Sequence, residues 1–199
     1  MAQSIQHDNQ KYTYADYLTW PEDERWELID GEPYCMSPGP MTQHQRISMS
    51  LGAQIWNFLE GKSCQVFSAP FDVRFAEPDA QNENVQTVVQ PDITVVCDSK
   101  KLDERGCKGA PDFIIEIISP SSVQRDLIKK RELYQRYGVR EYWVVHPGDR
   151  ILSVYLFDVP TQKFGAPDLL DMRGKRAVAT LPGLEIDLDK VMAEPKGGE

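Results

Sequence analysis

The chain of 199 residues has the composition of one folded domain, with 41% hydrophobic and 27% charged residues. Its net charge of −9 disfavours generic nucleic-acid binding, which needs a basic surface. No apolar run is long enough to span a bilayer and no basic-then-apolar leader is visible at the N-terminus, so we expect no membrane partner and a cytoplasmic location.

The four cysteines are widely spaced and form no Cys-x-x-Cys pair. They are Cys35, Cys64, Cys97 and Cys107. This spacing argues against a zinc site and against a disulfide framework, and it fits a reducing cytoplasm.

We expect a flexible N-terminus over residues 1–12, one domain over 13–190 and a flexible tail over 191–199. Thr13 is suited to cap a short helix over residues 14–18. The dipeptide Asp30-Gly31 lies between two runs that contain apolar residues, 25–29 and 32–36. Asp-Gly in this position is a strong hairpin signal, so the sequence predicts an N-terminal β-hairpin.

The middle of the chain alternates between helical and strand-like patterns. Ile47, Leu51, Ile55 and Phe58 recur at helical spacing and predict a helix over residues 42–59. Residues 65–75 and 88–97 alternate in the manner of strands. The polar stretch 77–87 predicts a loop that joins them as antiparallel neighbours, and 98–110 predicts another loop.

Residues 113–118 are apolar on both faces of an extended chain, apart from Glu116. This pattern predicts a central strand covered on both sides. Residues 119–122 would cap a helix over 123–137 that Gly138 ends. Further strands are predicted over 141–145, 150–157 and 177–181. Together these elements predict an α/β (α+β) fold with a mixed central sheet flanked by helices.

Glu116 is the most informative residue of the chain, because it interrupts an otherwise apolar strand. A carboxylate at such a position loses hydration, which costs several kcal/mol unless a partner or a metal compensates. A metal-binding role is one reading. The alternatives are an ion pair with an arginine, or a place at the solvent-exposed end of the strand.

Lys130 lies on the apolar stripe of the helix that follows. A rotation of about 100° per residue puts Val123, Leu127, Lys130 and Tyr134 within roughly 60° of one another, whereas Lys129 falls about 100° away from Lys130. We therefore expect Lys130 to face the sheet and Glu116, and Lys129 to face solvent or phosphate. Alternatively, Lys130 lies along the edge of the core with its ammonium group in water.

Asp92 lies on the strand before Glu116. Two carboxylates on neighbouring antiparallel strands can hold one Mg²⁺ or Mn²⁺, so Asp92 and Glu116 are the expected metal ligands. Lys130 would then activate water or stabilise charge on phosphorus. Asp92 could instead be an ordinary surface residue. Asp112 is a rival acid, but its position at a strand entry favours a role in the loop.

Glu27 and His44 are weaker candidates for the same catalytic site. Glu27 could add a third acid, and His44 could act as a base, a ligand or a phosphate contact, although a lone histidine is more often structural. Residues 121–140 hold six basic residues against two acids. This local surplus could hold a polyanion or form a solvated helix face.

Several motifs resemble the Uma2 family, a bacterial family abundant in cyanobacteria. The resemblance covers residues 14–188 and is carried by Glu27-Leu28-Ile29-Asp30-Gly31-Glu32, His44-Gln45, Pro91-Asp92, Glu116-Ile117-Ile118-Ser119-Pro120-Ser121, Asp126, Lys130-x-x-x-Tyr134 and Gly138-Val139-x-Glu141-Tyr142-Trp143. It implies a restriction-endonuclease-like fold of the PD-(D/E)xK type and Mg²⁺- or Mn²⁺-dependent nuclease activity. We expect nucleic acid, with DNA favoured, as substrate, and a homodimer.

Two positions depart from the pattern of this family. Ile118 stands where the motif lysine usually follows the second acid, and the resemblance places the lysine on the next helix, at Lys130. His146-Pro147 replaces the usual Asp-Pro. The displaced lysine and the acidic chain leave a second hypothesis open, a non-catalytic module for nucleic-acid binding or dimerisation. A direct ion pair between Glu116 and Lys130 would favour that module.

Overall fold

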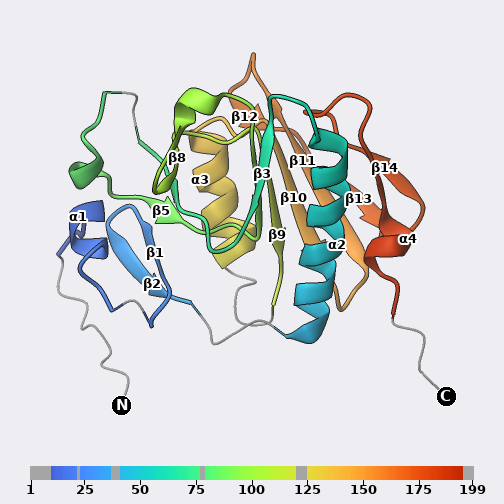
Figure 1. The fold of residues 1–199 in the computed structure, drawn as a ribbon, viewed down its shortest axis with the longest axis horizontal. Helices are drawn as coiled ribbons and strands as arrows, with labels where there is room; N and C mark the ends of the chain where they lie inside the picture. Colours follow the sequence, from blue (N-terminus) through green and yellow to red (C-terminus); the bar gives the residue numbers. More distant parts are fainter. Residues whose placement is uncertain (1–9, 22, 37–40, 77–78, 120–124, 195–199) are drawn as a thin grey trace.

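The structure is a computed structural model that describes residues 10–21, 23–36, 41–76, 79–119 and 125–194. It is a mixed α+β fold in which helices cover a central sheet (Figure 1). The helical segments are α1 (Tyr14–Tyr17), α2 (Thr42–Leu59), η1 (Asn82–Asn84), η2 (Ser99–Lys101), η3 (Arg125–Lys130), α3 (Arg131–Arg136) and α4 (Leu188–Val191).

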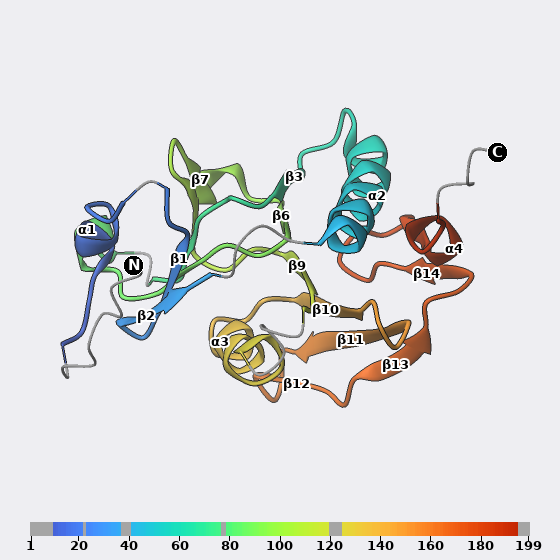
Figure 2. The ribbon, with the colours of Figure 1, turned by 90° about the horizontal axis from the view of Figure 1, so that it is seen from below.

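The central sheet is mixed, as predicted. Its strand order is β12 (Lys163–Phe164), β11 (Ile151–Asp158), β10 (Glu141–His146), β9 (Phe113–Ile117), β6 (Ile93–Val96) and β3 (Gln65–Ser68), and β13 (Asp168–Asp171) also pairs with β11. Strands β9 and β10 are parallel, whereas β6 is antiparallel to both β9 and β3. Helices α2 and α3 lie on opposite faces of this sheet (Figure 2).

A second sheet is built from strands that lie between residues 26 and 108. Its order is β2 (Glu32–Cys35), β1 (Trp26–Ile29), β5 (Val88–Val89), β4 (Val73–Arg74), β8 (Gly106–Lys108) and β7 (Leu102–Asp103). Two further strands, β14 (Lys175–Ala177) and β15 (Glu185–Asp187), pair with each other. The second sheet supplies β1, and β1 carries Glu27.

Strand β9 has the doubly covered environment that its sequence predicts. Phe113, Ile115 and Ile117 belong to the apolar cluster that includes the buried face of α2. Ile114 belongs to the other cluster, which contains Leu133 of α3. Because side chains alternate along a strand, Glu116 points to the same face as Ile114. All five residues of β9 are buried.

The predicted hairpin is confirmed, with β1 and β2 antiparallel and Ile29 opposite Glu32. Asp30 and Gly31 at the turn have φ angles of 51° and 77°. Both values lie in the left-handed region that a two-residue turn between twisted strands requires, and Gly and Asp tolerate it better than most residues.

The turn residue Asp30 also forms a bidentate ion pair with Arg136 of α3. The guanidinium nitrogens Nη1 and Nη2 donate to Oδ1 and Oδ2 of Asp30 at 2.7 and 3.1 Å. Hydrogen bonds from Arg136 hold the pKa of Asp30 below its usual value. The pair therefore stabilises the fold at pH values above the unfolded-state pKa of Asp30, and this stabilisation is lost as pH falls through the lowered pKa.

We expect Asp30→Asn to lower the free energy of unfolding near neutral pH by about 0.5 kcal/mol, because both side chains are roughly half exposed. Asn keeps the left-handed backbone accessible. Urea unfolding of both proteins as a function of pH measures the effect. The difference should vanish below the lowered pKa of Asp30, and a difference that persists there would contradict the ion-pair explanation.

Two strands predicted as continuous are each divided between the two sheets, and on this point the prediction was wrong. Residues 65–75 form β3 in the central sheet and β4 in the second sheet, and residues 88–97 form β5 and β6 in the same way. Pro70 and Pro91 lie at the two breaks. Proline has no N–H to donate, so it interrupts a ladder at the point where the chain changes sheets.

Other element boundaries differ from the prediction. The expected loop over 98–110 contains η2, β7 and β8, and the strand expected at 177–181 lies instead at 175–177. The described part of the helix predicted over 123–137 begins at Arg125 and ends at Arg136, and Gly138 follows with a φ of 73°. Residues 120–124, which contain most of the predicted cap and the predicted helix start, lie outside the described residues.

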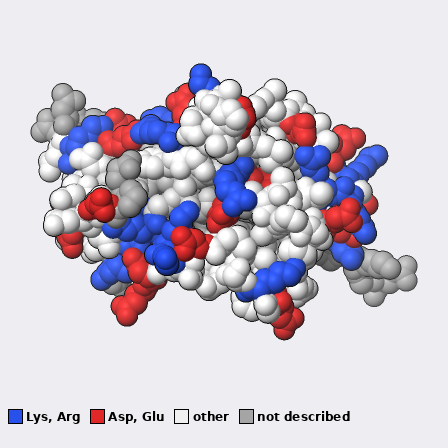
Figure 3. All heavy atoms as spheres, turned by 90° about the horizontal axis from the view of Figure 1, so that it is seen from above, with Lys and Arg blue, Asp and Glu red and all other residues white. Residues whose placement is uncertain are grey.

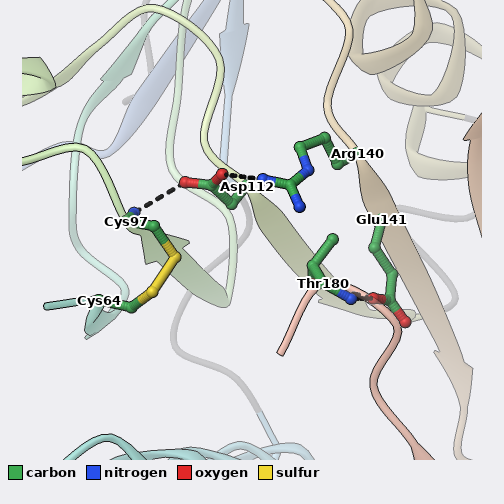
Figure 4. The surroundings of a disulfide bond; sticks show 6 residues. All are labelled: Cys64, Cys97, Asp112, Arg140, Glu141 and Thr180. Atoms are coloured by element: carbon green, nitrogen blue, oxygen red, sulfur yellow. Dashed lines mark hydrogen bonds and ion pairs between the residues drawn. A yellow bond between two sulfur atoms is a disulfide. The ribbon is translucent and has the colours of Figure 1, made fainter. Parts of the chain in front are cut away.

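Cys64 and Cys97 form a disulfide, so the argument from cysteine spacing against a disulfide framework was wrong for this pair (Figure 4). Gln65 lies opposite Val96 in the antiparallel pair of β3 and β6, so positions 64 and 97 are opposite each other one step further on. The 33 residues between them hide this proximity in the sequence. In Figure 4 the backbone N–H of Cys97 donates to Asp112, at 2.7 Å.

Candidate active site

Lys130 lies between two buried carboxylates. Its Nζ is 2.7 Å from Glu27 Oε1 and 2.9 Å from Glu116 Oε1, and the three side chains are at most 4% exposed. The predicted orientation of Lys130 towards Glu116 is therefore confirmed. The alternative with its ammonium group in water is wrong, and Lys130 is a buried partner of Glu116.

Tyr134 lies one helical turn after Lys130 and adds a second contact to Glu116. Its hydroxyl donates to Glu116 Oε1 at 2.6 Å. Burial, with a further contribution from the nearby carboxylate of Glu116, raises the pKa of Tyr134 well above its ordinary value. Tyr134 therefore keeps its proton and remains a hydrogen-bond donor. The sequence placed it on the same stripe as Lys130 but gave no reason to include it in the site.

Asp92 and His44 form the second part of the site. Asp92 Oδ2 accepts a 2.7 Å hydrogen bond from the backbone N–H of Ile117, and His44 Nε2 lies 3.3 Å from the same oxygen. The side chains of Asp92 and His44 are 20% and 15% exposed, so they are more accessible than the lysine cluster. His44 reaches Asp92 from the first turn of α2.

The two parts meet across the antiparallel strands β6 and β9. Ile93 pairs with Ile115; Asp92 comes directly before Ile93 and Glu116 directly after Ile115, and the Asp92 carboxylate binds the backbone N–H of Ile117. Among the described residues, this places the carboxylates of Asp92, Glu116 and Glu27 and the ammonium group of Lys130 in one region of the fold.

Gln90 connects this site to the second sheet. Its backbone N–H donates to Glu27 Oε1 at 3.0 Å. Its side-chain nitrogen donates to Tyr17 Oη at 3.1 Å and to Asp72 Oδ1 at 2.9 Å, while its oxygen accepts from Arg25 at 3.0 Å. Gln90 therefore fixes the short segment that leads to Asp92. The sequence predicted Gln90 as a strand residue but did not predict that it joins the site to the second sheet.

Lys129 and Asp112 behave as expected. Lys129 is 46% exposed, and its ammonium group contacts the hydroxyl of Tyr34 on β2. Asp112 binds the backbone of Cys97 and forms a 3.0 Å ion pair with Arg140 (Figure 4). The carboxylate of Asp112 thus serves the loop and the strand entry.

The surface charge is mixed rather than uniformly basic. Lys and Arg side chains alternate with Asp and Glu side chains across the face in Figure 3, with uncharged areas between them. Together with the net charge of −9, this distribution gives little long-range attraction for a polyanion.

The described residues contain no group of three or more His, Cys, Asp or Glu side chains arranged to hold a metal ion. Among the same residues, no helix is both long and apolar enough to cross a membrane.

Comparison with known proteins matches nearly the whole chain to one family. The model of the Uma2 family, described as "Putative restriction endonuclease", matches residues 14–189. A Synechocystis protein named "Uncharacterized protein slr1290" is 29% identical over 126 residues, which are 62% of this chain and 62% of that relative's length.

The fold has a counterpart among solved structures. A crystal structure described as "a putative nuclease belonging to DUF820", from Anabaena variabilis, superposes with a TM-score of 0.71 at 20% sequence identity. The superposition covers 90% of this chain and 97% of that chain. The predicted restriction-endonuclease-like fold is therefore confirmed.

Proposed function

The chain belongs to the Uma2 family, and from this premise we propose that it is a divalent-metal-dependent nuclease that hydrolyses phosphodiester bonds in nucleic acid. One observation carries the proposal. Asp92 comes directly before β6 and accepts a hydrogen bond from the backbone of Ile117, the residue after Glu116, and Lys130 contacts Glu116 at 2.9 Å. Two acids can hold a divalent ion and a neighbouring lysine can stabilise charge on phosphorus, a combination that supports metal-assisted phosphodiester hydrolysis.

The donor set fits Mg²⁺ or Mn²⁺. Asp92 and Glu116 would hold the ion, because Mg²⁺ prefers oxygen ligands and commonly takes one or two protein carboxylates while water fills its other positions. A bound ion of this kind supplies Lewis-acid polarisation of the phosphate and a more acidic water. The partial exposure of Asp92 leaves this side of the site accessible from solvent.

The remaining residues position these groups and supply charge. Glu27 holds Lys130 at 2.7 Å, and the backbone of Gln90 holds Glu27. The ammonium group of Lys130 would stabilise negative charge that develops on phosphorus. His44, 3.3 Å from Asp92, would orient that carboxylate or contact the phosphate. DNA is the substrate we favour.

Cleavage of plasmid DNA and labelled oligonucleotides, DNA and RNA, with Mn²⁺ tests the proposal. We expect Asp92→Asn and Glu116→Gln each to lower the cleavage rate by about 100-fold or more, since each removes a negatively charged ligand while keeping the side-chain shape. Asp112→Asn is the matched control and should retain activity. Wild-type activity that none of these changes affects would contradict the assignment, provided thermal melts show each variant folded.

One observation favours a non-catalytic module instead. Lys130 forms direct ion pairs with both Glu27 and Glu116, the arrangement expected if these charges serve only the fold. Titration calorimetry with Mn²⁺ separates the two functions. Mn²⁺ binding that is lost in Asp92→Asn supports the nuclease, whereas absence of binding together with absence of cleavage supports the module.

A further inference from the structure

We propose that the open edge of β3, together with an exposed apolar stripe on α2, is the surface through which two copies of this chain associate. The stripe consists of Met49 and Trp56. The two copies would pair their β3 strands antiparallel and pack these stripes against each other. This inference is independent of whether the site cleaves nucleic acid.

Strand β3 ends the central sheet, and within the described parts of the chain no strand pairs with its outer edge. The N–H of Ala69 donates to the carbonyl of Asp92, which continues the ladder between β3 and β6. Because hydrogen-bonded and non-hydrogen-bonded pairs alternate in an antiparallel ladder, the N–H and C=O groups of Val66 and Ser68 point outward. Residues 63–71 contain no charged side chain, although exposed edges usually carry charge against pairing.

The exposed stripe of α2 borders the side of the helix that lies next to β3. A Cβ atom built on Gly52 would lie 3.7 Å from Ser68 Oγ, so Gly52 marks the side of the helix next to β3. Met49 and Trp56 lie three residues before and four residues after Gly52, so they are turned from it by about 60° and about 40°, towards solvent. Their side chains are 73% and 65% exposed. Two large apolar side chains at such exposure on neighbouring turns of one helix can supply the apolar part of a protein interface.

The edge strand is held firmly in place. The disulfide of Cys64 joins its first end to β6, and the rings of Phe67 and Phe71 stack with centroids 4.1 Å apart at the other end. Val66 packs against the apolar cluster on the α2 face of the sheet, and Phe67 packs against the cluster on the opposite face. A strand fixed in this way loses little further conformational freedom when it pairs.

The charge pattern favours a second copy of the chain as the partner. Two copies with a net charge of −9 repel over most of their surfaces, but residues 42–59 contain a single Lys, Arg, Asp or Glu, Arg46. Contact at this face therefore avoids the like charges. A basic partner attracted by the acidic chain would find no acid on β3. A strand that pairs antiparallel with itself also generates the two-fold symmetry of most homodimers.

Sedimentation velocity over a concentration series tests the interface. We expect a dimer for the native protein, and at least about tenfold weaker association for Trp56→Lys and for Met49→Lys, because large buried side chains dominate interface energy. Ser68→Pro removes one outward N–H and should also weaken association, since edge strands tolerate proline. Leu169→Lys changes a side chain that is 67% exposed on β13 and should leave the dimer intact.

Circular dichroism melts establish that each variant is folded before its association is compared. A native protein that stays monomeric throughout the concentration series would overturn the proposal. So would a dimer that Leu169→Lys weakens as much as Trp56→Lys does, or one that neither stripe variant affects.

Discussion

Lys130→Met is expected to lower the free energy of unfolding by about 3–5 kcal/mol near neutral pH, because it leaves two buried carboxylates without the cation that they share. Nζ of Lys130 is within 3 Å of both Glu27 and Glu116, and neither carboxylate is appreciably exposed. Met has a similar length and fills the space of the lysine chain, so the loss reports the charge rather than a cavity.

The size of this loss should depend on pH. Acid neutralises the negative charge that Lys130→Met leaves uncompensated, so the stability deficit of the variant relative to wild type should shrink as pH falls. Chemical denaturation near neutral pH and near pH 4 measures the change. A deficit that is constant with pH would contradict the electrostatic explanation.

Lys129→Met is the matched control for Lys130→Met. The two lysines are adjacent in sequence, but Lys129 is 46% exposed. We expect its replacement to change stability by no more than about 0.5 kcal/mol, as for most surface substitutions. The double change Glu116→Gln with Lys130→Met should recover part of the loss, since it removes one of the uncompensated charges. Equal losses of unfolding free energy in the Lys129 and Lys130 variants would contradict the assignment of Lys130 as the buried cation.

The central part of the site could be predicted because its signals are local. An apolar run with one acid identified Glu116, and helical phase distinguished Lys130 from Lys129. Each inference uses only residues of a single element, the strand for Glu116 and the helix for Lys130. Tyr134 lies on the same helical stripe as Lys130. Its hydrogen bond to Glu116 depends on how closely α3 approaches β9, and helical periodicity does not specify that distance.

The rest of the site depends on contacts between distant segments. Glu27 was a weak candidate in the sequence, yet it is as close to Lys130 as Glu116 is. Its hairpin joins a separate sheet, and the path from β5 to β6 through Gln90 brings that sheet to the site. Because strand alternation continues across Pro70 and Pro91, the pattern alone could not reveal that both long strands change sheets there.

The contacts of Lys130 and of Asp92 bear differently on the two functional hypotheses, the nuclease and the non-catalytic module. The ion pairs of Lys130 explain how a glutamate can be buried in the central strand without a metal. They do not account for Asp92, which is anchored by the backbone of Ile117 next to Glu116 and remains partly exposed. Substitution of Asp92 therefore distinguishes the nuclease from the module better than substitution of Lys130 does. Replacing Lys130 is expected to change stability as well as catalysis.

Removal of the Cys64–Cys97 disulfide is expected to lower the free energy of unfolding by about 3–4 kcal/mol. A crosslink restricts the unfolded chain by an amount that grows with the closed loop, and the 33-residue separation here corresponds to this magnitude. The double change Cys64→Ser with Cys97→Ser, measured by urea unfolding under non-reducing conditions, gives the difference directly. Reduction of the native protein with dithiothreitol should give the same shift.

Cys35→Ser is the control for this measurement, because Cys35 is exposed and free. Its replacement should leave both stability and the response to dithiothreitol unchanged. The disulfide joins β3 to β6 and lies outside the lysine cluster of Glu27, Glu116 and Lys130. Its loss should therefore add to the effect of Lys130→Met, as expected for changes with no shared partner. A strongly non-additive result would mean that the disulfide at one end of β6 is energetically coupled to the lysine cluster near the other end.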